Sequence, residues 1–305
     1  MRRTILVLLF VYAVVGGSGA LAGDSKLEAS HSDDIERWFE GRVERLTAPT
    51  GYLSIAGLFW LEEGENSFGS DPSNDFVFPD KAPGTMGVFR VDNGKVTVVV
   101  DPRVKITSDG KAIARLELSN DHDDGGATVL QWGTLSWFVI QRGETRLIRL
   151  KDPESENRTN FGTLQRYAVD EKWMVAGKAE FYPVTKYFET VNSVGIPAHE
   201  RFYGAVVFEL DGETYRLDAL YEMGTEDWFI IFADETSGLE TYGAGRYLYC
   251  EPPDEDGNVV IDFNKSYNPP CAFSEFTTCL FAPPQNFLPI RVTAGEKTYQ
   301  SVTKK

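Results

Sequence analysis

Histidine and cysteine are scarce in this sequence, and their scarcity excludes many familiar catalytic and metal sites. There are three of each in 305 residues. The histidines are His31, His122 and His199. His31 lies in a polar leader, so a metal site made of all three histidines would have to include that leader, which disfavours such a site. A Ser-His-Asp triad would have to use His122 or His199, and no Gly-x-Ser-x-Gly motif supports one. We predict no metal and no cofactor, and whether the protein is an enzyme stays open.

The sequence also lacks a run of basic residues. Its 30 Lys and Arg are spread along the chain against 46 Asp and Glu, which gives a net charge of −16. Neutralising a phosphate backbone needs a concentrated positive face. We therefore predict that nucleic acid is not a partner and that the acidity serves solubility.

The first residues have the pattern of an export signal. Two arginines precede the unbroken apolar run Ile5 to Val15, and Ala20-Leu21-Ala22 has the small residues typical of a cleavage site. We expect cleavage after Ala22 and export to the periplasm or the cell exterior. The apolar run is too short for a good transmembrane helix, so we expect no stable membrane insertion after cleavage. An uncleaved anchor is the alternative.

Three cysteines, Cys250, Cys271 and Cys279, lie beyond this signal. Exported chains meet an oxidising compartment, in which disulfides form. We predict a Cys271–Cys279 disulfide, because this pair closes a small loop, and we expect Cys250 to be buried and free. The alternative is that all three are reduced thiols in the core.

Apart from one helix, the sequence predicts strands. Asp33 to Leu46 places apolar side chains on one stripe at helical spacing, with Asp33 as the expected N-cap. Later, short apolar runs flank turns such as Asp92-Asn93-Gly94 and Asp109-Gly110, which are typical of β-hairpins. Strands of this length and spacing predict a mostly β protein built from sandwiches or barrels.

The same patterns divide the chain into four parts. We predict a signal peptide at 1–22, a leader and amphipathic helix at 23–50, a β-sandwich at 51–152 and a second β domain, sandwich or barrel, at 153–305. The boundary between the two β domains is placed at the polar break Asp152 to Thr159.

Polar side chains are concentrated in one stiff segment, Asp262 to Phe273 (D-F-N-K-S-Y-N-P-P-C-A-F). Its two prolines fix two φ angles and remove two backbone donors. Carbohydrate sites use the same mixture of aromatic faces, amides and carboxylates. We predict ligand-binding roles for Asp262, Asn264, Tyr267 and Asn268. The alternative is that Asn264 and Asn268 cap backbone turns before the prolines.

Arg246 follows Gly243-Ala244-Gly245 and begins an aromatic strand. A buried arginine needs a carboxylate partner, which Asp234 or Asp262 could supply. Two interpretations remain open: a buried ion pair between strands, or an anion anchor in a pocket shared with the Asp262 segment. The second makes Arg246 a ligand-binding residue. A ligand-binding or hydrolase site at this place requires the Asp262 segment to fold against the strand that Arg246 begins.

Two further candidates for chemistry have weaker patterns. His199 and Glu200 suggest an acid–base pair, but adjacent residues of a regular strand point to opposite faces. Cys271 as a nucleophile would need an activating histidine or helix N-terminus, and neither is next to it in the sequence.

Several long motifs carry a family resemblance. They are G-Y-L-S-I-A-G-L-F-W-L-E-E-G (51–64), G-S-D-P-S-N-D (69–75), F-A-D-E-T-S-G (232–238), T-Y-G-A-G-R (241–246), the Cys271 segment and A-G-E-K (294–297). Over roughly Asp33 to Tyr299 the chain resembles the bacterial and archaeal domain-of-unknown-function family 1684. The resemblance implies no particular activity.

A second resemblance covers part of the first β domain. The segment Phe68 to Pro79 is similar to the opening of forkhead-associated domains, β-sandwiches that usually bind phosphothreonine. Ser70 stands where those domains place a phosphate-contacting arginine, and Ala82 to Phe89 lacks their histidine. The resemblance implies the sandwich fold; without the guanidinium we expect no phosphopeptide partner.

Three classes of function remain. The leading hypothesis is a noncatalytic binding module for a small or carbohydrate-like ligand near Arg246 and the Asp262 segment. The first alternative is a hydrolase that uses carboxylates such as Asp234 and Asp262 as an acid–base pair facing one cleft. The second is a purely structural envelope protein.

Overall fold

The computed structural model describes residues 30–222 and 224–300. The predicted signal peptide, 1–22, lies outside these residues. The described chain is mostly β with one long N-terminal helix, which confirms the predicted fold class. No helix in this part of the chain combines the length and apolar character that crossing a membrane requires.

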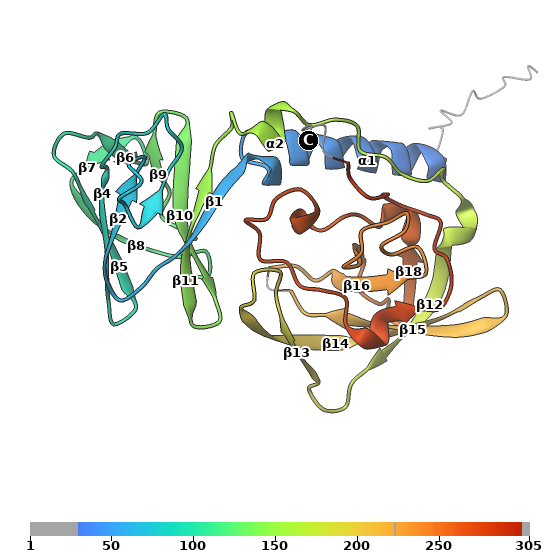
Figure 1. Cartoon of the computed structure of the whole chain (residues 1–305). Coiled ribbons are helices and arrows are strands. Elements are labelled where there is room, and N and C mark those ends of the chain that lie inside the picture. The colour runs from blue at the N-terminus through green and yellow to red at the C-terminus, as the bar shows by residue number, and fades with distance from the viewer. Residues whose placement is uncertain (1–29, 223, 301–305) are drawn as a thin grey trace, which may run out of the picture.

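Helix α1 (His31–Thr47) begins two residues before the predicted start. The Ser30 hydroxyl accepts a hydrogen bond from the Asp33 N–H, and the Asp33 carboxylate accepts one from the Ser30 N–H, both at 3.2 Å. The prediction of Asp33 as the N-cap is therefore wrong, because Asp33 is the third helical residue of a reciprocal capping box. Leu46 packs with Leu53 and Phe273, and the helix lies along the second β domain (Figure 1).

The first β domain is a sandwich of two sheets. One has the order β1 (Ile55–Trp60), β11 (Thr145–Lys151), β10 (Leu135–Arg142), β9 (Leu130–Trp132), β6 (Ile106–Ser108) and β7 (Lys111–Ile113). The other has the order β3 (Phe76–Val77), β2 (Gly64–Gly69), β4 (Gly87–Asp92), β5 (Lys95–Val100) and β8 (Arg115–Leu118).

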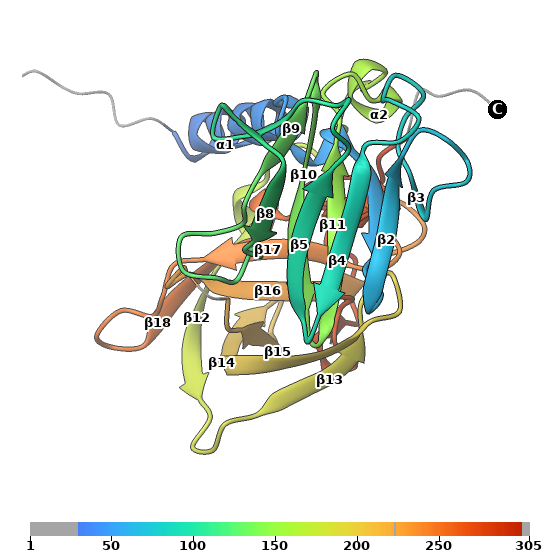
Figure 2. The same ribbon diagram turned by 90° about the vertical axis from the view of Figure 1, so that its left-hand side faces the viewer.

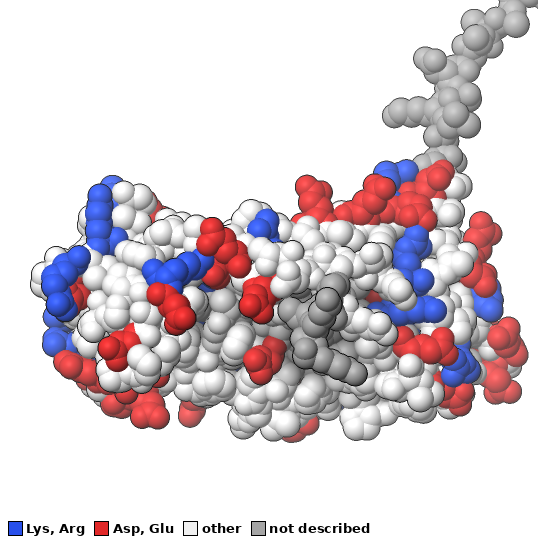
Figure 3. Space-filling view, turned by 45° about the horizontal axis from the view of Figure 1, so that its top comes forward, with Lys and Arg blue, Asp and Glu red and all other residues white. Residues whose placement is uncertain are grey.

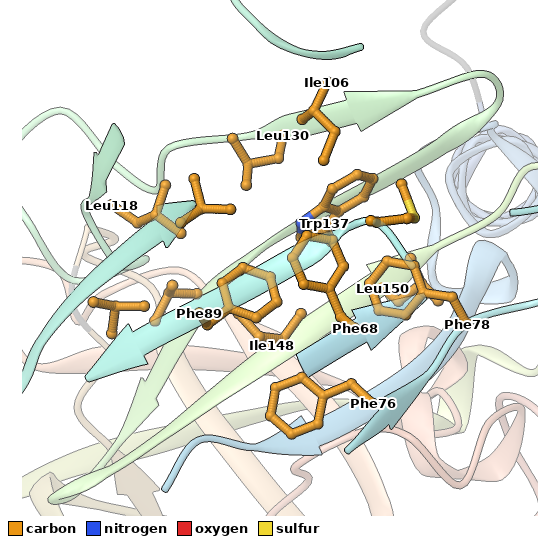
Figure 4. Close-up of a cluster of buried hydrophobic side chains, with 14 of the residues drawn as sticks. Phe68, Phe76, Phe78, Phe89, Ile106, Leu118, Leu130, Trp137, Ile148 and Leu150 are labelled. Atoms are coloured by element: carbon orange, nitrogen blue, oxygen red, sulfur yellow. The ribbon is translucent and has the colours of Figure 1, made fainter. Parts of the chain in front are cut away.

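Aromatic rings fill the space between these sheets (Figure 4). Phe68 and Phe89 stack with ring centroids 4.4 Å apart, and Trp137 meets Phe68 from the opposite sheet at 5.9 Å. Ile148 and Leu150 of β11 also point into this core. Since side chains alternate along a strand, Leu147, Arg149 and Lys151 point to the outer face of the same sheet.

The second β domain is one strongly curved sheet. Its order is β17 (Arg246–Cys250), β16 (Trp228–Asp234), β15 (Glu213–Leu220), β14 (Pro197–Leu210), β12 (Met174–Phe181) and β18 (Asn258–Asp262), with β13 (Tyr187–Val191) on β14 and β19 (Phe287–Leu288) on β16. The short helices are α2 (Glu156–Thr159), η1 (Tyr52–Ser54), η2 (Glu171–Trp173), η3 (Phe263–Lys265), η4 (Pro270–Ala272) and η5 (Pro284–Asn286).

Alternation along β17 separates two environments. Leu248 and Cys250 face the core inside the curved sheet, which also contains Phe263. Tyr247 and Tyr249 face the other side, where Cys279 packs. By the same period of two, Arg246 points inward with Leu248.

The two β domains meet along the outer face of the β1–β11–β10 sheet. Leu58, Ile140 and Leu147 of the sandwich form an apolar cluster with Ile196 of the second domain. Arg142 Nε donates to Thr278 Oγ1 at 3.1 Å across the same junction. In Figure 2 the sandwich strands stand in front of β16 and β17, which run across behind them.

Gly295 offers a test of how tightly the second domain is packed. Its φ is +72°, and a Cβ there would lie 2.2 Å from Ser266 Oγ and 2.4 Å from the Ser266 carbonyl oxygen. Gly212, in the same domain, has φ +84° and nothing within 4 Å of its Cβ position. We predict that Gly212→Ala costs about 1–2 kcal/mol of backbone strain. Gly295→Ala should cost about 1–3 kcal/mol more, because the added methyl also overpacks.

Urea unfolding of the two variants checks this difference. Equal losses would show that the Ser266 contact relaxes without cost.

Candidate functional site

A cavity of about 690 Å³ lies where the two domains and helix α1 meet. The sandwich contributes β1, β10, β11 and the η1 segment, and the second domain contributes β16, β17 and the segment 267–280. The lining residues are Trp38, Arg42, Arg45, Thr50, Gly51, Tyr52, Ile55, Arg142, Arg149, Lys151, Glu222, Phe229, Tyr247, Tyr249, Tyr267, Pro270, Thr278, Cys279 and Leu280. Glu222 is the single acidic residue of this lining, against five basic residues.

This basic lining contrasts with the rest of the molecule. The chain has a net charge of −16, and Figure 3 shows acidic side chains gathered at the end where α1 begins. Arg142 is neutralised by Asp121, whose carboxylate lies 2.8 Å from its guanidinium. Arg42 is neutralised by Glu296 at 3.1 Å.

Arg149 and Lys151 are not neutralised in this way. Within 30–222 and 224–300 neither forms a salt bridge, and both project from the outer face of β11 toward the cavity. Arg149 is 9% exposed. Its Nη2 lies 3.4 Å from Thr278 Oγ1, and its buried Nε has no hydrogen-bond partner among the described atoms. Lys151 Nζ donates to the Thr50 carbonyl at 2.5 Å.

The pKa shifts of the two residues reflect this lack of compensation. Burial lowers the pKa of Arg149, and the charge of Arg142 lowers it further. Burial also lowers the pKa of Lys151, and Arg149 adds to the effect. Each shift means that the cation would be stabilised by a negative charge placed beside it.

Aromatic rings form the opposite wall. Tyr249 stacks on Phe229 at 4.8 Å and faces Tyr267 at 6.4 Å. Burial raises the pKa of Tyr247, Tyr249 and Tyr267, so these phenols are neutral at physiological pH. The Glu222 carboxylate accepts a hydrogen bond from the Tyr249 hydroxyl. The rings of this wall are therefore uncharged, and Glu222 is its one carboxylate.

Two of the three cysteines lie at this wall. Cys250, Cys271 and Cys279 are all free thiols, so the predicted Cys271–Cys279 disulfide is not formed in the structure. The two are nevertheless neighbours, because the Cys271 N–H donates to Cys279 Sγ at 3.1 Å. Hydrogen bonding from the Cys271 thiol lowers the pKa of Cys279 to about 7 against the opposing effect of burial. The same interaction raises the pKa of Cys271.

The segment that follows β18 folds against β17, as the sequence analysis required. Tyr247 and Tyr267 form an antiparallel bridge with N–H···O distances of 2.8 and 2.9 Å. Of the predicted ligand-binding residues, Tyr267 lines the cavity. Asn268 binds the Lys297 carbonyl at 2.8 Å and Asn264 binds the Asp170 carbonyl at 3.0 Å. These amides bind the backbone of distant segments, whereas the alternative interpretation expected them to cap turns before the prolines.

Arg246 lies on the opposite side of β17, enclosed in the core with 0% exposure. Its guanidinium lies 3.4 Å from Asp234 Oδ1 and donates to the carbonyls of Val292, at 3.0 Å, and Ala294. This is the buried ion pair of the first interpretation, with the first of its two expected carboxylates. The residue does not line the cavity.

Asp262 occupies a third environment. Its carboxylate lies 2.8 Å from His31 Nε2, beside a second cavity of about 610 Å³. Asp234 is enclosed with Arg246, so the structure does not bring the two carboxylates of the hydrolase hypothesis together. His199 pairs with Glu189 across the β13–β14 ladder rather than with Glu200. Within the described residues, no group of three or more His, Cys, Asp or Glu is placed to hold a metal ion.

Comparisons with known proteins identify the family of this chain. Residues 159–297 match the family described as "Protein of unknown function (DUF1684)", and the chain belongs to that family. This span is narrower than the one predicted from the motifs. The solution NMR structure of an uncharacterized protein of Haloarcula marismortui is 30% identical, with a TM-score of 0.40, and the match covers 46% of this chain and 79% of that one.

A phosphothreonine-dependent forkhead-associated domain is also similar, at 15% identity and a TM-score of 0.21, over 31% of this chain and 92% of that one. A score this low supports no argument. No curated protein matches the chain.

The ion pair of Arg246 gives the first prediction for this region. Removing one partner of a buried pair leaves the other charge uncompensated, so Arg246→Ala should lower the free energy of unfolding by about 3–5 kcal/mol. Arg291→Ala, which removes a half-exposed partner of Glu240 in the same domain, should cost about 1 kcal/mol or less. Urea unfolding measures both, and equal losses would contradict the enclosed pair.

Thiol reactivity gives the second prediction. The rate of Cys279 alkylation by iodoacetamide should rise as the pH passes about 7, because only the thiolate attacks and its pKa is lowered. Burial raises the pKa of Cys250 to about 12, so that thiol should remain unreactive in the same samples.

Peptide mass spectrometry after timed quenching separates the sites. In Cys271→Ala, which removes the thiol donor, the midpoint should move upward toward the ordinary cysteine value of about 8.5. An unchanged midpoint would show that Cys271 does not set it.

Proposed function

We propose that this protein binds a small organic anion in the cavity between its two domains. The observation that carries the proposal is that Arg149 and Lys151 line the cavity without a carboxylate partner among the described residues. A buried guanidinium without an anionic partner is costly, since burial without compensation disfavours the charged form. A bound carboxylate or phosphate would supply the missing charge and accept hydrogen bonds from both cations.

The polar and apolar walls define two parts of the ligand. The anionic group would lie between Arg149, Lys151 and Thr278, whose hydroxyl is already 3.4 Å from the guanidinium. The rest of the ligand would lie against the rings of Tyr249 and Tyr267. Aromatic faces accept either a planar ring or the C–H surface of a sugar. An anionic sugar would therefore satisfy the carbohydrate-like ligand expected from the sequence.

The size of the cavity fits such a molecule. Pockets for small ligands typically enclose about 300–1,000 Å³ and combine apolar walls with a few converging polar groups. This cavity, at about 690 Å³, lies within that range. A noncatalytic binding role is favoured over carboxylate hydrolysis because Asp234 and Asp262 have separate partners. The N-terminal sequence pattern supports the further proposal that binding takes place outside the cytoplasm.

Phenyl phosphate is a suitable probe because it joins a phosphate to a ring. We predict that it binds more tightly than either inorganic phosphate or phenol, since each of these offers half of the contacts. Replacing Arg149 by Gln should weaken phenyl phosphate binding by about ten- to a hundredfold, as expected for loss of a charge-assisted hydrogen bond. Isothermal titration calorimetry measures these affinities.

Arg103→Gln is the matched control. Arg103 belongs to the same sandwich, is paired with Asp101 and has a side chain that is 80% exposed. Its replacement should leave the affinity unchanged. Equal affinities for Arg149→Gln and the unmodified protein would exclude the proposed anion site.

A further inference from the structure

We propose that Cys279 and Cys271 form a redox-active thiol pair that exchanges with a low-molecular-weight disulfide bearing carboxylates. The inference rests on the proposed anion site, because Cys279 lines the same cavity as Arg149 and Lys151.

The pair is arranged so that the two sulfurs have different surroundings. Cys279 Sγ accepts the Cys271 N–H at 3.1 Å and lies 3.6 Å from Thr277 Oγ1. Cys271 Sγ accepts a hydrogen bond from the Tyr242 hydroxyl at 3.5 Å. Cys279 lines the cavity, whereas Cys271 does not and is hydrogen-bonded to Tyr242 instead.

The electrostatic surroundings favour a thiolate on Cys279. The pKa of this thiol is about 7, and thiols with a pKa near the ambient pH are the most effective in exchange. The positive charge of Arg149 lies close enough to interact with the sulfur. Cys271, whose pKa is raised, stays protonated until Cys279 has reacted.

The exchange then proceeds in two balanced steps. The Cys279 thiolate attacks one sulfur of the disulfide R–S–S–R, which forms a Cys279–S–S–R bond, breaks the R–S–S–R bond and expels RS⁻. Cys271 loses its proton to solvent and attacks Cys279 Sγ, which forms the Cys271–Cys279 bond and expels the second RS⁻. The protein dithiol is oxidised by two electrons, and one disulfide is reduced to two thiols.

The basic lining selects the class of disulfide. A substrate with carboxylates would place them at Arg149 and Lys151, which have no carboxylate partner among the described residues. Its disulfide would then extend along the cavity toward Cys279. A neutral disulfide of similar reactivity gains nothing from these cations. A faster reaction with the anionic disulfide would therefore show that Arg149 and Lys151 hold it close to Cys279.

The test compares glutathione disulfide, which carries more carboxylates than amino groups, with neutral 2-hydroxyethyl disulfide. With glutathione disulfide the native protein should lose two hydrogen atoms and form a Cys271–Cys279 bond, as seen by intact mass and peptide mapping. Cys271→Ser should instead accumulate one glutathione adduct on Cys279. Arg149→Gln should slow the reaction with glutathione disulfide by roughly tenfold and leave the neutral reagent unaffected.

Cys250→Ser is the control, because Cys250 lies in the core, with its thiol 3.8 Å from the Trp228 carbonyl, and should play no part. Initial modification of Cys250 or Cys271, or no exchange by the native protein, would overturn the inference. Phenyl phosphate affinity separates the two proposals. If the native protein binds phenyl phosphate and fails to exchange, only the thiol inference is lost. If exchange occurs without a preference for the anionic reagent and phenyl phosphate does not bind, the proposed anion site is lost.

Discussion

The buried contact between Arg42 and Glu296 is the interaction on which the cavity most depends. It joins α1 to the last part of the described chain, with a distance of 3.1 Å between the Arg42 Nε and the carboxylate. The same guanidinium donates to the Asn268 carbonyl at 2.9 Å and lies 4.6 Å from the ring centre of Tyr267. The second oxygen of Glu296 accepts the Asn268 N–H at 2.8 Å. One ion pair thus fixes the helix, the tyrosine wall and the proline segment relative to one another.

Arg42 and Arg149 both line the cavity and are both buried, but only Arg42 has a carboxylate partner. Arg42 is fully compensated, so its contribution is structural. Arg149 is as deeply buried and keeps an unpartnered Nε, and Lys151 next to it raises the local positive charge. The chain has 46 Asp and Glu against 30 Lys and Arg, yet none of these carboxylates is paired with Arg149 among the described residues. Proteins leave a local requirement such as charge pairing unmet at functional sites, where a bound ligand can supply the missing charge.

The sequence was informative about local structure and less so about orientation. Turn residues predicted the hairpins because Asn-Gly and Asp-Gly favour the required backbone angles wherever they occur. The buried pairing of Arg246 with Asp234 followed from the cost of an uncompensated charge. The side of β17 to which Arg246 points did not follow, because both faces of that strand are buried and its residues give no polar face to read. Tyr247 and Tyr249 of the same strand line the cavity, whereas Arg246 does not.

The basic wall was missed for a different reason. Arg149 and Lys151 come from β11, which is distant in the sequence from the cysteine and tyrosine wall, and a tertiary contact between two domains brings them together. One signal was available: in T-R-L-I-R-L-K, Arg149 and Lys151 share a face of the strand with Leu147, whereas Ile148 and Leu150 on the opposite face are apolar. Alternation of this kind on a strand buried on both faces indicates that something must satisfy the charges.

The family segment, 159–297, contains the tyrosines of β17, Tyr267 and the cavity thiol Cys279, whereas Arg149 and Lys151 lie outside it. The cavity is therefore composite: the second domain supplies the aromatic and thiol wall, and the sandwich supplies Arg142, Arg149 and Lys151. In the second domain alone the rings of this wall would be exposed to water. In the sandwich alone Arg149 and Lys151 would be hydrated. Docking the sandwich onto the second domain removes water from both, which strengthens the field of the cations at the thiol wall. The specificity proposed for this site thus arises from the junction of the domains rather than from the family segment itself.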